Sequence, residues 1–107
     1  ISMGAREGSL SADELSGGTY TLSNNGSFGT LLTGAIINQP QVGILSIDAI
    51  KKRPVVIEDS TGDSIAIRPI GILSQSFDHR TIDGSYSAAF LHKIRTILEE
   101  KDWSAEL

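Results

Sequence analysis

The stretch Phe77-Asp-His-Arg-Thr-Ile-Asp-Gly84 lies where a strand pattern ends and a helical pattern begins. After it, apolar residues recur with the period of a helix, which predicts an amphipathic helix over residues 85–101. The apolar stripe consists of Phe90, Leu91, Ile94, Ile97 and Leu98. A helix with one apolar side that follows a strand is expected to pack on a sheet, so the chain is assigned to the α/β class.

A hairpin is predicted upstream of this stretch. Asp59-Ser-Thr-Gly-Asp63 has the composition of a tight turn, so Pro54–Glu58 and Ser64–Phe77 are expected to pair antiparallel. Pro69 marks an edge or a bulge in the second strand, because proline cannot donate a ladder hydrogen bond. The charged run Lys51-Lys-Arg-Pro54 is expected to separate this hairpin from the preceding apolar run.

Two further strands are predicted nearer the N-terminus. Val42–Ile50 is almost continuously apolar, which is typical of a central strand covered on both faces. Thr19–Ser23 alternates, with Tyr20 and Leu22 on one face, so it is expected to be a half-buried strand that ends at a serine.

The remaining segments are expected to be irregular. Asn24-Asn-Gly26 breaks the first strand, and the glycine-rich stretch Ser27–Pro40 sustains no period, which predicts a partly buried connection. Residues 1–17 are read as a lead-in. Within it, Ser11 and Glu14 have the spacing of a capping box for one short helical turn.

Composition excludes several classes of function. Nine basic and 13 acidic residues give a net charge of −4 over 107 residues, which argues against a nucleic-acid or anionic-membrane partner. The absence of cysteine excludes disulfides, thiolate metal sites and thiol nucleophiles. No apolar run reaches the roughly 18 residues that a membrane span needs, and residues 1–4 do not resemble a signal peptide.

One imidazole lies among charged neighbours in the opening stretch. Histidine titrates near pH 6.5, so His79 is a candidate general base. Asp83, four positions later, has three possible roles: to orient the ring, to pair with Arg80, or to cap the helix. The residues alone do not choose between them, and a polar turn without catalytic function is the simpler alternative.

Several motifs resemble the catalytic domain of the dihydrolipoyl acyltransferase component of 2-oxoacid dehydrogenase complexes. The signature Asp-His-Arg-x-x-Asp-Gly stands at residues 78–84, and the resemblance extends in order from residue 5 to about residue 101. The other matching segments are Ala5-Arg-Glu-Gly8, Gly17-Gly-Thr-Tyr-Thr-Leu-Ser-Asn24, Ile37-Asn-Gln-Pro-Gln41, Ile44-Leu45 and Lys52-Arg-Pro-Val55. Family patterns differ at three positions: Gln75 replaces a usual leucine, Gly71 a bulky residue and Phe77 a common tyrosine.

The resemblance implies a reaction and roles for particular residues. An acyl group moves between a dihydrolipoyl-lysine arm and coenzyme A, with His79 as general base and Ser23 as hydrogen-bond donor to the oxyanion. Asp83 would complete the catalytic set. The supporting residues would be Asp78, Arg80 and Gly84. No metal is implied.

The resemblance also implies an architecture. It is the chloramphenicol acetyltransferase-like fold of coenzyme A-dependent acyltransferases, a two-layer sandwich with a mixed β-sheet, of which residues 1–107 would form the C-terminal half. Residues 1–17 are the lead-in, 18–82 the strands and loops, and 83–101 the C-terminal helix. The rest of the domain and the lipoyl domain would lie outside this chain, so the isolated fragment is expected to have little activity.

Partners follow from the same resemblance. The family forms homotrimers with the active site between subunits, in which one subunit gives the histidine and its neighbour gives the serine. The trimers build a larger core. This core binds the 2-oxoacid dehydrogenase and dihydrolipoyl dehydrogenase components. A cytoplasmic location is expected, or the mitochondrial matrix in a eukaryote. Two alternatives stay open: a chloramphenicol acetyltransferase-like enzyme acting on a small molecule, and a non-catalytic scaffold piece of the core.

Other candidate residues have simpler interpretations. His92 is expected to be a solvated group on the helix, and Asp59 and Asp63 to be turn formers rather than calcium ligands. Gly26-Ser-Phe-Gly29 has the wrong spacing for a hydrolase elbow. Trp103 is expected to cover an apolar edge.

Overall fold

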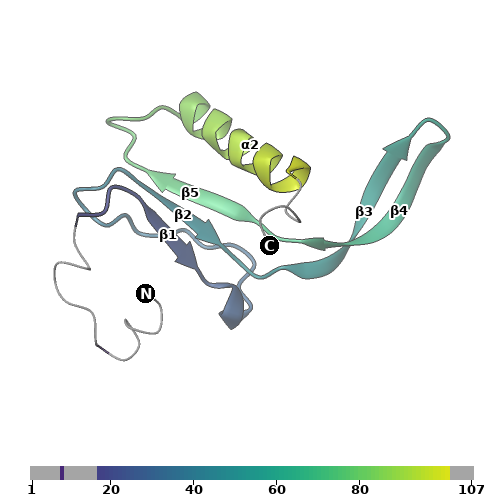
Figure 1. Cartoon of the computed structure of the whole chain (residues 1–107), viewed down its shortest axis with the longest axis horizontal. Coiled ribbons are helices and arrows are strands. Elements are labelled where there is room, and N and C mark those ends of the chain that lie inside the picture. The colour runs from purple at the N-terminus through teal and green to yellow at the C-terminus, as the bar shows by residue number, and fades with distance from the viewer. Residues whose placement is uncertain (1–7, 9–16, 102–107) are drawn as a thin grey trace.

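The computed structural model describes residue 8 and residues 17–101. Their elements, in chain order, are β1 (Thr21–Asn24), the short 3-10 helix η1 (Gly26–Phe28), β2 (Gly43–Ile47), β3 (Lys51–Asp59), β4 (Gly62–Ile70), β5 (Leu73–Phe77) and α2 (Gly84–Glu100). Figure 1 shows a small sheet covered by one helix and a long ribbon that extends away from it. The expected capping box at Ser11 and Glu14, and Trp103, lie outside the described residues.

The three-stranded sheet has the order β1-β2-β5 and is mixed, because β1 runs parallel to β2 while β5 runs antiparallel to it. Ile44 and Leu45 in β2 are the buried apolar residues of the described part of the chain, at 5% and 7% exposure. The predicted central strand is therefore confirmed, although it ends at Ile47 rather than Ile50. The mixed sheet with one covering helix also confirms the predicted fold class.

The predicted hairpin is confirmed as a two-stranded ribbon of β3 and β4. At its tip, Asp59 accepts hydrogen bonds at Oδ1 from the backbone N–H and the hydroxyl of Thr61, at 2.8 and 2.6 Å. The prediction that Lys51–Pro54 ends a strand is wrong, since β3 begins at Lys51. These residues continue the strand because the ribbon leaves the sheet (Figure 1) and Lys51 and Lys52 remain exposed to water.

The expectation of one strand over Ser64–Phe77 is also wrong. The chain breaks after Ile70, and its two halves pair with different partners, β4 with β3 and β5 with β2. At the break, a Cβ on Gly71 would come within 2.9 Å of Ile50 Cγ1. The absence of a side chain thus allows the ribbon to pass close to Ile50 as the chain turns into the sheet.

The predicted helix is confirmed as α2, which packs over β5. Tyr20 meets Phe90 edge to face, with ring centroids 6.0 Å apart. Leu91 and Ile94 of the predicted stripe are half-buried, whereas the other three stripe residues are more exposed. Among the helix residues, Ser87 is the buried one, at 4% exposure.

The first strand is shorter than expected, and its two faces are not covered as predicted. Leu22 is 61% exposed and Tyr20 41%, whereas Thr21 and Ser23 on the opposite face are half-buried. The prediction of an irregular connection after this strand is confirmed. Beyond Phe28, the stretch up to Pro40 contains no helix or strand.

Candidate active site

The turn between β5 and α2 is built around the backbone of Asp78. Its N–H donates to the carbonyl of Val42 at 2.8 Å, which ties the turn to the residue before β2. Its carbonyl accepts hydrogen bonds from the backbone N–H groups of Thr81 and Ile82, at 3.0 and 3.1 Å. The segment that carries the histidine is therefore fixed to the sheet at one end and closed on itself at the other.

The side chains of Asp78 and Arg80 close the same turn. Arg80 Nε donates to Asp78 Oδ1 at 3.0 Å and a terminal guanidinium nitrogen donates to Oδ2 at 2.8 Å, while the Arg80 backbone N–H also binds Oδ1 at 3.0 Å. These bonds to Arg80 lower the pKa of Asp78 to about 2. The ion pair of Asp78 and Arg80 therefore helps to close the histidine turn.

His79 projects from this turn and is exposed to solvent. Its ring lies against Phe77, with centroids 5.3 Å apart and planes inclined by 44°. An exposed imidazole next to an aromatic ring, on a turn fixed by its neighbours, is accessible to a substrate from outside the chain.

Of the three roles open to Asp83, the structure shows helix capping. Asp83 Oδ1 accepts from the backbone N–H of Tyr86 at 2.7 Å and from the hydroxyl of Ser85 at 3.0 Å. These bonds, with a smaller contribution from the charge of His79, lower the pKa of Asp83. Arg80 is engaged with Asp78 instead. Asp83 therefore fixes the start of α2, and hence the far end of the histidine turn.

Gly84 is the first residue of α2. A Cβ placed on it would meet no atom within 4 Å among the described residues. Among the described residues, no close contact therefore requires a glycine at this position.

Ser23 lies in β1 and faces a cluster of polar groups. Its Oγ receives a hydrogen bond from Asn25 Nδ2 at 3.4 Å, and the same nitrogen lies 3.3 Å from Ser46 Oγ and 3.4 Å from Thr33 Oγ1. Asn25 is itself fixed, because its backbone N–H donates to the carbonyl of Ile47 at 2.9 Å. The serine is thus held by a connected group from β1, β2 and the irregular connection.

Asp48 anchors this group and is the site residue that the sequence reasoning missed. Its carboxylate is 1% exposed, and Oδ1 accepts hydrogen bonds from the hydroxyls of Thr30 at 2.5 Å and Thr33 at 2.6 Å. These two hydroxyls lower the pKa of Asp48, so the carboxylate stays ionised. The sequence does carry a sign that Asp48 has a special role, since it is the one acidic residue in the apolar run Val42–Ile50.

The fold of one chain does not bring Ser23 and His79 together. Across the sheet, Ser23 is aligned with Ser46 and, through it, with Ser74, whereas His79 follows Phe77, which is paired with Gly43. Three residues along β5 and two strand spacings place the α-carbons of Ser23 and Phe77 roughly 14 Å apart. His79 follows two residues after Phe77, beyond the end of β5.

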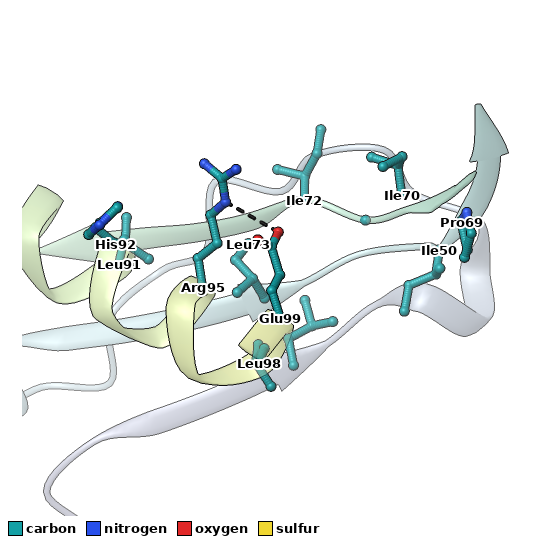
Figure 2. Close-up of a pocket in the computed structure, with 12 residues that line it drawn as sticks. Ile50, Pro69, Ile70, Ile72, Leu73, Leu91, His92, Arg95, Leu98 and Glu99 are labelled. Atoms are coloured by element: carbon teal, nitrogen blue, oxygen red, sulfur yellow. Dashed lines mark hydrogen bonds and ion pairs between the residues drawn. The ribbon is translucent and has the colours of Figure 1, made fainter. Parts of the chain in front are cut away.

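A cavity of about 780 Å³ lies elsewhere, between the base of the ribbon and the C-terminal half of α2 (Figure 2). Its walls are mainly apolar, and the ion pair between Arg95 Nε and Glu99 Oε1, at 3.2 Å, lies at the helix side of it. His92 also lines it and is exposed, as expected. Neither Ser23 nor His79 contributes to this cavity, so it is not the candidate active site.

Among residues 17–101, no group of three or more His, Asp or Glu side chains is placed to hold a metal ion. Over the same residues, no helix has the length and apolar character needed to cross a membrane.

Three curated relatives resemble this chain closely. It is 46% identical over 98 residues to a dihydrolipoyllysine-residue succinyltransferase component of a 2-oxoglutarate dehydrogenase complex from Rickettsia typhi. It is 44% identical over 97 residues to a lipoamide acyltransferase component of a branched-chain alpha-keto acid dehydrogenase complex from Bacillus subtilis, and 44% identical over 108 residues to a dihydrolipoyllysine-residue acetyltransferase component of a pyruvate dehydrogenase complex from Mycobacterium tuberculosis. These matches cover 92%, 91% and 100% of this chain but 24%, 22% and 20% of the relatives.

Solved structures agree with these relatives. A probable dihydrolipoamide acetyltransferase from Listeria monocytogenes superposes with a TM-score of 0.84 at 42% identity, over 92% of this chain and 40% of that one. A dihydrolipoamide acetyltransferase from Azotobacter vinelandii, studied for the role of a serine, a histidine and an asparagine in its catalytic mechanism, superposes with a TM-score of 0.81 at 32% identity. The cubic core of a pyruvate dehydrogenase multienzyme complex gives 0.81 at 31% identity, and both of these matches cover 92% of this chain and 39% of the other.

The model of one protein family matches almost the whole chain. This family is described as 2-oxoacid dehydrogenases acyltransferase (catalytic domain), and the match runs from residue 1 to residue 104. The chain spans about a quarter or less of the length of the three curated relatives, and it belongs to the 2-oxoacid dehydrogenase acyltransferase catalytic-domain family.

Proposed function

We propose that this chain supplies the C-terminal part of a catalytic domain that moves an acyl group between dihydrolipoyl-lysine and coenzyme A in a 2-oxoacid dehydrogenase complex. The observation that carries the proposal is His79, exposed on a turn that Asp78, Arg80 and Asp83 fix between sheet and helix, in a member of this family. Transfer to coenzyme A and the reverse transfer use the same groups.

In the proposed reaction His79 is the general base. A neutral imidazole nitrogen takes the proton from the attacking thiol, and the resulting thiolate forms a bond to the carbonyl carbon of the acyl thioester. When the tetrahedral intermediate collapses, its bond to the other sulfur breaks and the imidazolium returns the proton to that leaving thiolate. Atoms and electrons therefore balance without a metal or a redox cofactor, and we propose that none is used.

Ser23 is proposed to donate a hydrogen bond to the oxyanion of that intermediate. Loss of one such donor lowers kcat by about 100- to 1000-fold in related chemistry. The Azotobacter vinelandii relative was studied for catalytic roles of a serine, a histidine and an asparagine. Its histidine and asparagine are four positions apart, as His79 and Asp83 are here, which supports Asp83 as the third member of the site.

The distance between Ser23 and His79 supports an active site formed between two subunits. We propose a homotrimer in which each site combines the histidine of one subunit with the serine of its neighbour, and trimers that assemble into a larger core. A relative of known structure is the cubic core of a pyruvate dehydrogenase multienzyme complex. The 2-oxoacid dehydrogenase and dihydrolipoyl dehydrogenase components, and a lipoyl group on a separate domain, would be its partners, in the cytoplasm or in a mitochondrial matrix.

The proposal is tested by replacing each of the two histidines of the chain in the complete protein. His79→Ala and His79→Gln are expected to lower acyl transfer from acyl-coenzyme A to dihydrolipoamide by at least about 100-fold. His92→Ala is the matched control, because His92 is also exposed but lies on α2, and it is expected to leave the rate unchanged. Unchanged transfer in both His79 variants, with normal particle size, would favour a scaffold function.

Acetyl-, succinyl- and branched-chain acyl-coenzyme A are compared in the same assay, because the three relatives differ in the acyl group that they are named for. The second measurement is the dependence of the acyl-transfer rate on dihydrolipoamide. Transfer to a small acceptor such as chloramphenicol, with none to dihydrolipoamide, would replace the proposal with the small-molecule acetyltransferase alternative.

A further inference from the structure

We propose that Asn25, oriented by Asp48 through Thr33, is a positioning residue that directs the hydroxyl hydrogen of Ser23 toward the oxyanion. The inference rests on the proposed function, in which Ser23 is the oxyanion donor. It adds a group that contacts no substrate and acts only through the serine.

Asp48 sets the direction of the network because an ionised carboxylate only accepts hydrogen bonds. Thr33 Oγ1 lies 2.6 Å from Asp48 Oδ1, so the single hydroxyl hydrogen of Thr33 is donated to the carboxylate. Thr33 is then able only to accept from its other neighbour. The carboxylate keeps this role at neutral pH, because its two hydroxyl partners favour the charged form.

This constraint fixes which end of the Asn25 amide faces the cluster. Thr33 Oγ1 needs a donor, and the group at 3.4 Å from it is Asn25 Nδ2. With the amide reversed, a carbonyl oxygen would face a hydroxyl whose hydrogen is already committed to Asp48, leaving two acceptors in contact. The orientation of the Asn25 side chain is therefore determined by a carboxylate that it does not touch.

The same amide nitrogen makes Ser23 an acceptor. Asn25 Nδ2 lies 3.4 Å from Ser23 Oγ and 3.3 Å from Ser46 Oγ. These distances are long because two amide hydrogens are shared among three oxygens. Among the residues that the structure describes, Asn25 is the one hydrogen-bond partner of the Ser23 hydroxyl. Its own hydrogen is therefore not used inside the described chain and remains available to a substrate oxyanion.

Asn25 is well placed to hold this geometry because its backbone is bound on both sides. Its N–H donates to the carbonyl of Ile47 in β2 at 2.9 Å, and its own carbonyl accepts from the backbone N–H of Phe28 at 3.1 Å. A donor that does not need to reorganise during the reaction contributes most to stabilising a developing charge.

The decisive variant is Asn25→Asp in the complete protein, which keeps the shape of the side chain but replaces the amide donor with an acceptor. Ser23 is then expected to donate to the new carboxylate instead of to the oxyanion. The expected result is a fall in kcat comparable to that of Ser23→Ala, about 100- to 1000-fold, with KM little changed. Thermal unfolding of each variant is measured alongside, so that loss of fold is seen separately.

A double variant separates this role from a direct effect of the added charge. If Asn25 acts through Ser23, Asn25→Asp causes no further loss in a Ser23→Ala background. An equal loss in both backgrounds would mean that the charge acts directly on the reaction and would overturn the inference. So would an Asn25→Asp variant with normal kcat while Ser23→Ala is impaired, and in that case the proposed role of Ser23 would stand.

Two variants of Thr33 keep the test informative if Asn25→Asp does not fold. Thr33→Val removes the hydroxyl that links Asp48 to Asn25 without changing side-chain size, and a three- to tenfold fall in kcat is expected, about the value of one hydrogen bond. Thr33→Ser retains the hydroxyl and is expected to restore the rate. Equal rates in the two variants would overturn the inference. An active Ser23→Ala variant would also remove its basis, whereas the His79 variants test the reaction itself.

Discussion

Ser23 and His79 lie toward opposite ends of the three-stranded sheet, Ser23 level with Ser46 in β2 and His79 beyond Phe77, the partner of Gly43. Within the described chain, the strand register therefore places the two residues apart. Ser23 accepts a hydrogen bond from Asn25, and His79 lies on the closed turn around Asp78. This combination of fixed groups far apart is what a site between two subunits requires.

Subunit mixing tests this arrangement. Ser23→Ala and His79→Ala are each expected to be nearly inactive, whereas co-assembly of equal amounts is expected to recover about a quarter of the normal activity, because a shared site is intact with probability one half times one half. The measurement is acyl transfer after joint refolding or co-expression. Recovery no greater than the summed activities of the separate variants would show that both groups act from the same chain.

Replacing Asp83 separates helix capping from an effect of its charge. Asp83→Ala removes the acceptor for the Tyr86 N–H and is expected to lower the thermal midpoint by roughly a few degrees. Asp83→Asn is expected to keep both the midpoint and the activity, since asparagine caps helices as well as aspartate does. An Asn variant with a normal midpoint but an activity as low as that of the Ala variant would show that the charge itself is needed.

The pair Asp78 and Arg80 predicts a loss of stability in acid. The pKa of Asp78 is lowered from 3.8 to about 2, so the folded state favours its charged form more than the unfolded state does. The resulting stabilisation is complete above about pH 4 and disappears as the pH falls through 2. The effect is small because the Arg80 side chain is 84% exposed.

Urea unfolding measured from pH 5 to pH 2 checks this prediction. Asp78→Asn is expected to be less stable at pH 5 and to show a weaker dependence on pH below 4. A variant with the same acid dependence as the wild type would assign the transition to other carboxylates.

The sequence predicted the helices and strands better than it predicted which strands pair with each other. The helix, the central strand and the hairpin turn follow from local patterns, because periodicity and turn composition act over a few residues. The split of Ser64–Phe77 into β4 and β5 was missed, since it depends on where the ribbon leaves the sheet beside Ile50, a contact between distant residues. Lys51 and Lys52 begin β3 instead of ending a strand, and in the ribbon both side chains remain exposed to water.

The candidate site likewise has one part that the sequence predicted and one part that it did not. The cluster around His79 is contiguous in sequence, so Asp78, Arg80 and Asp83 could be found by inspection, although only the structure chose capping for Asp83. Asp48 reaches Thr33 from 15 positions away through an irregular connection. No local pattern predicts such a hydrogen bond, because the path of the connection is set by the whole fold.

Gln75 stands where related sequences are expected to have leucine. Gln75 Nε2 donates to Ser87 Oγ at 2.6 Å, and Gln75 Oε1 accepts from the Tyr20 hydroxyl at 2.5 Å, so one amide links β5 to the buried serine of α2 and to the residue before β1. Gln75→Leu leaves the Ser87 hydroxyl, 4% exposed, without this partner. A cost of about 1–3 kcal/mol in the free energy of unfolding is expected, measured by urea denaturation.

Ser87→Ala combined with Gln75→Leu provides the matched comparison. Removing both partners of a buried hydrogen bond is far less costly than removing one, so the double variant is expected to be more stable than Gln75→Leu alone. Tyr20 is 41% exposed, and its hydroxyl is expected to bind water instead. If the double variant is instead less stable than Gln75→Leu, then Ser87 stabilises the helix independently of Gln75, and the amide is not the link between helix and sheet.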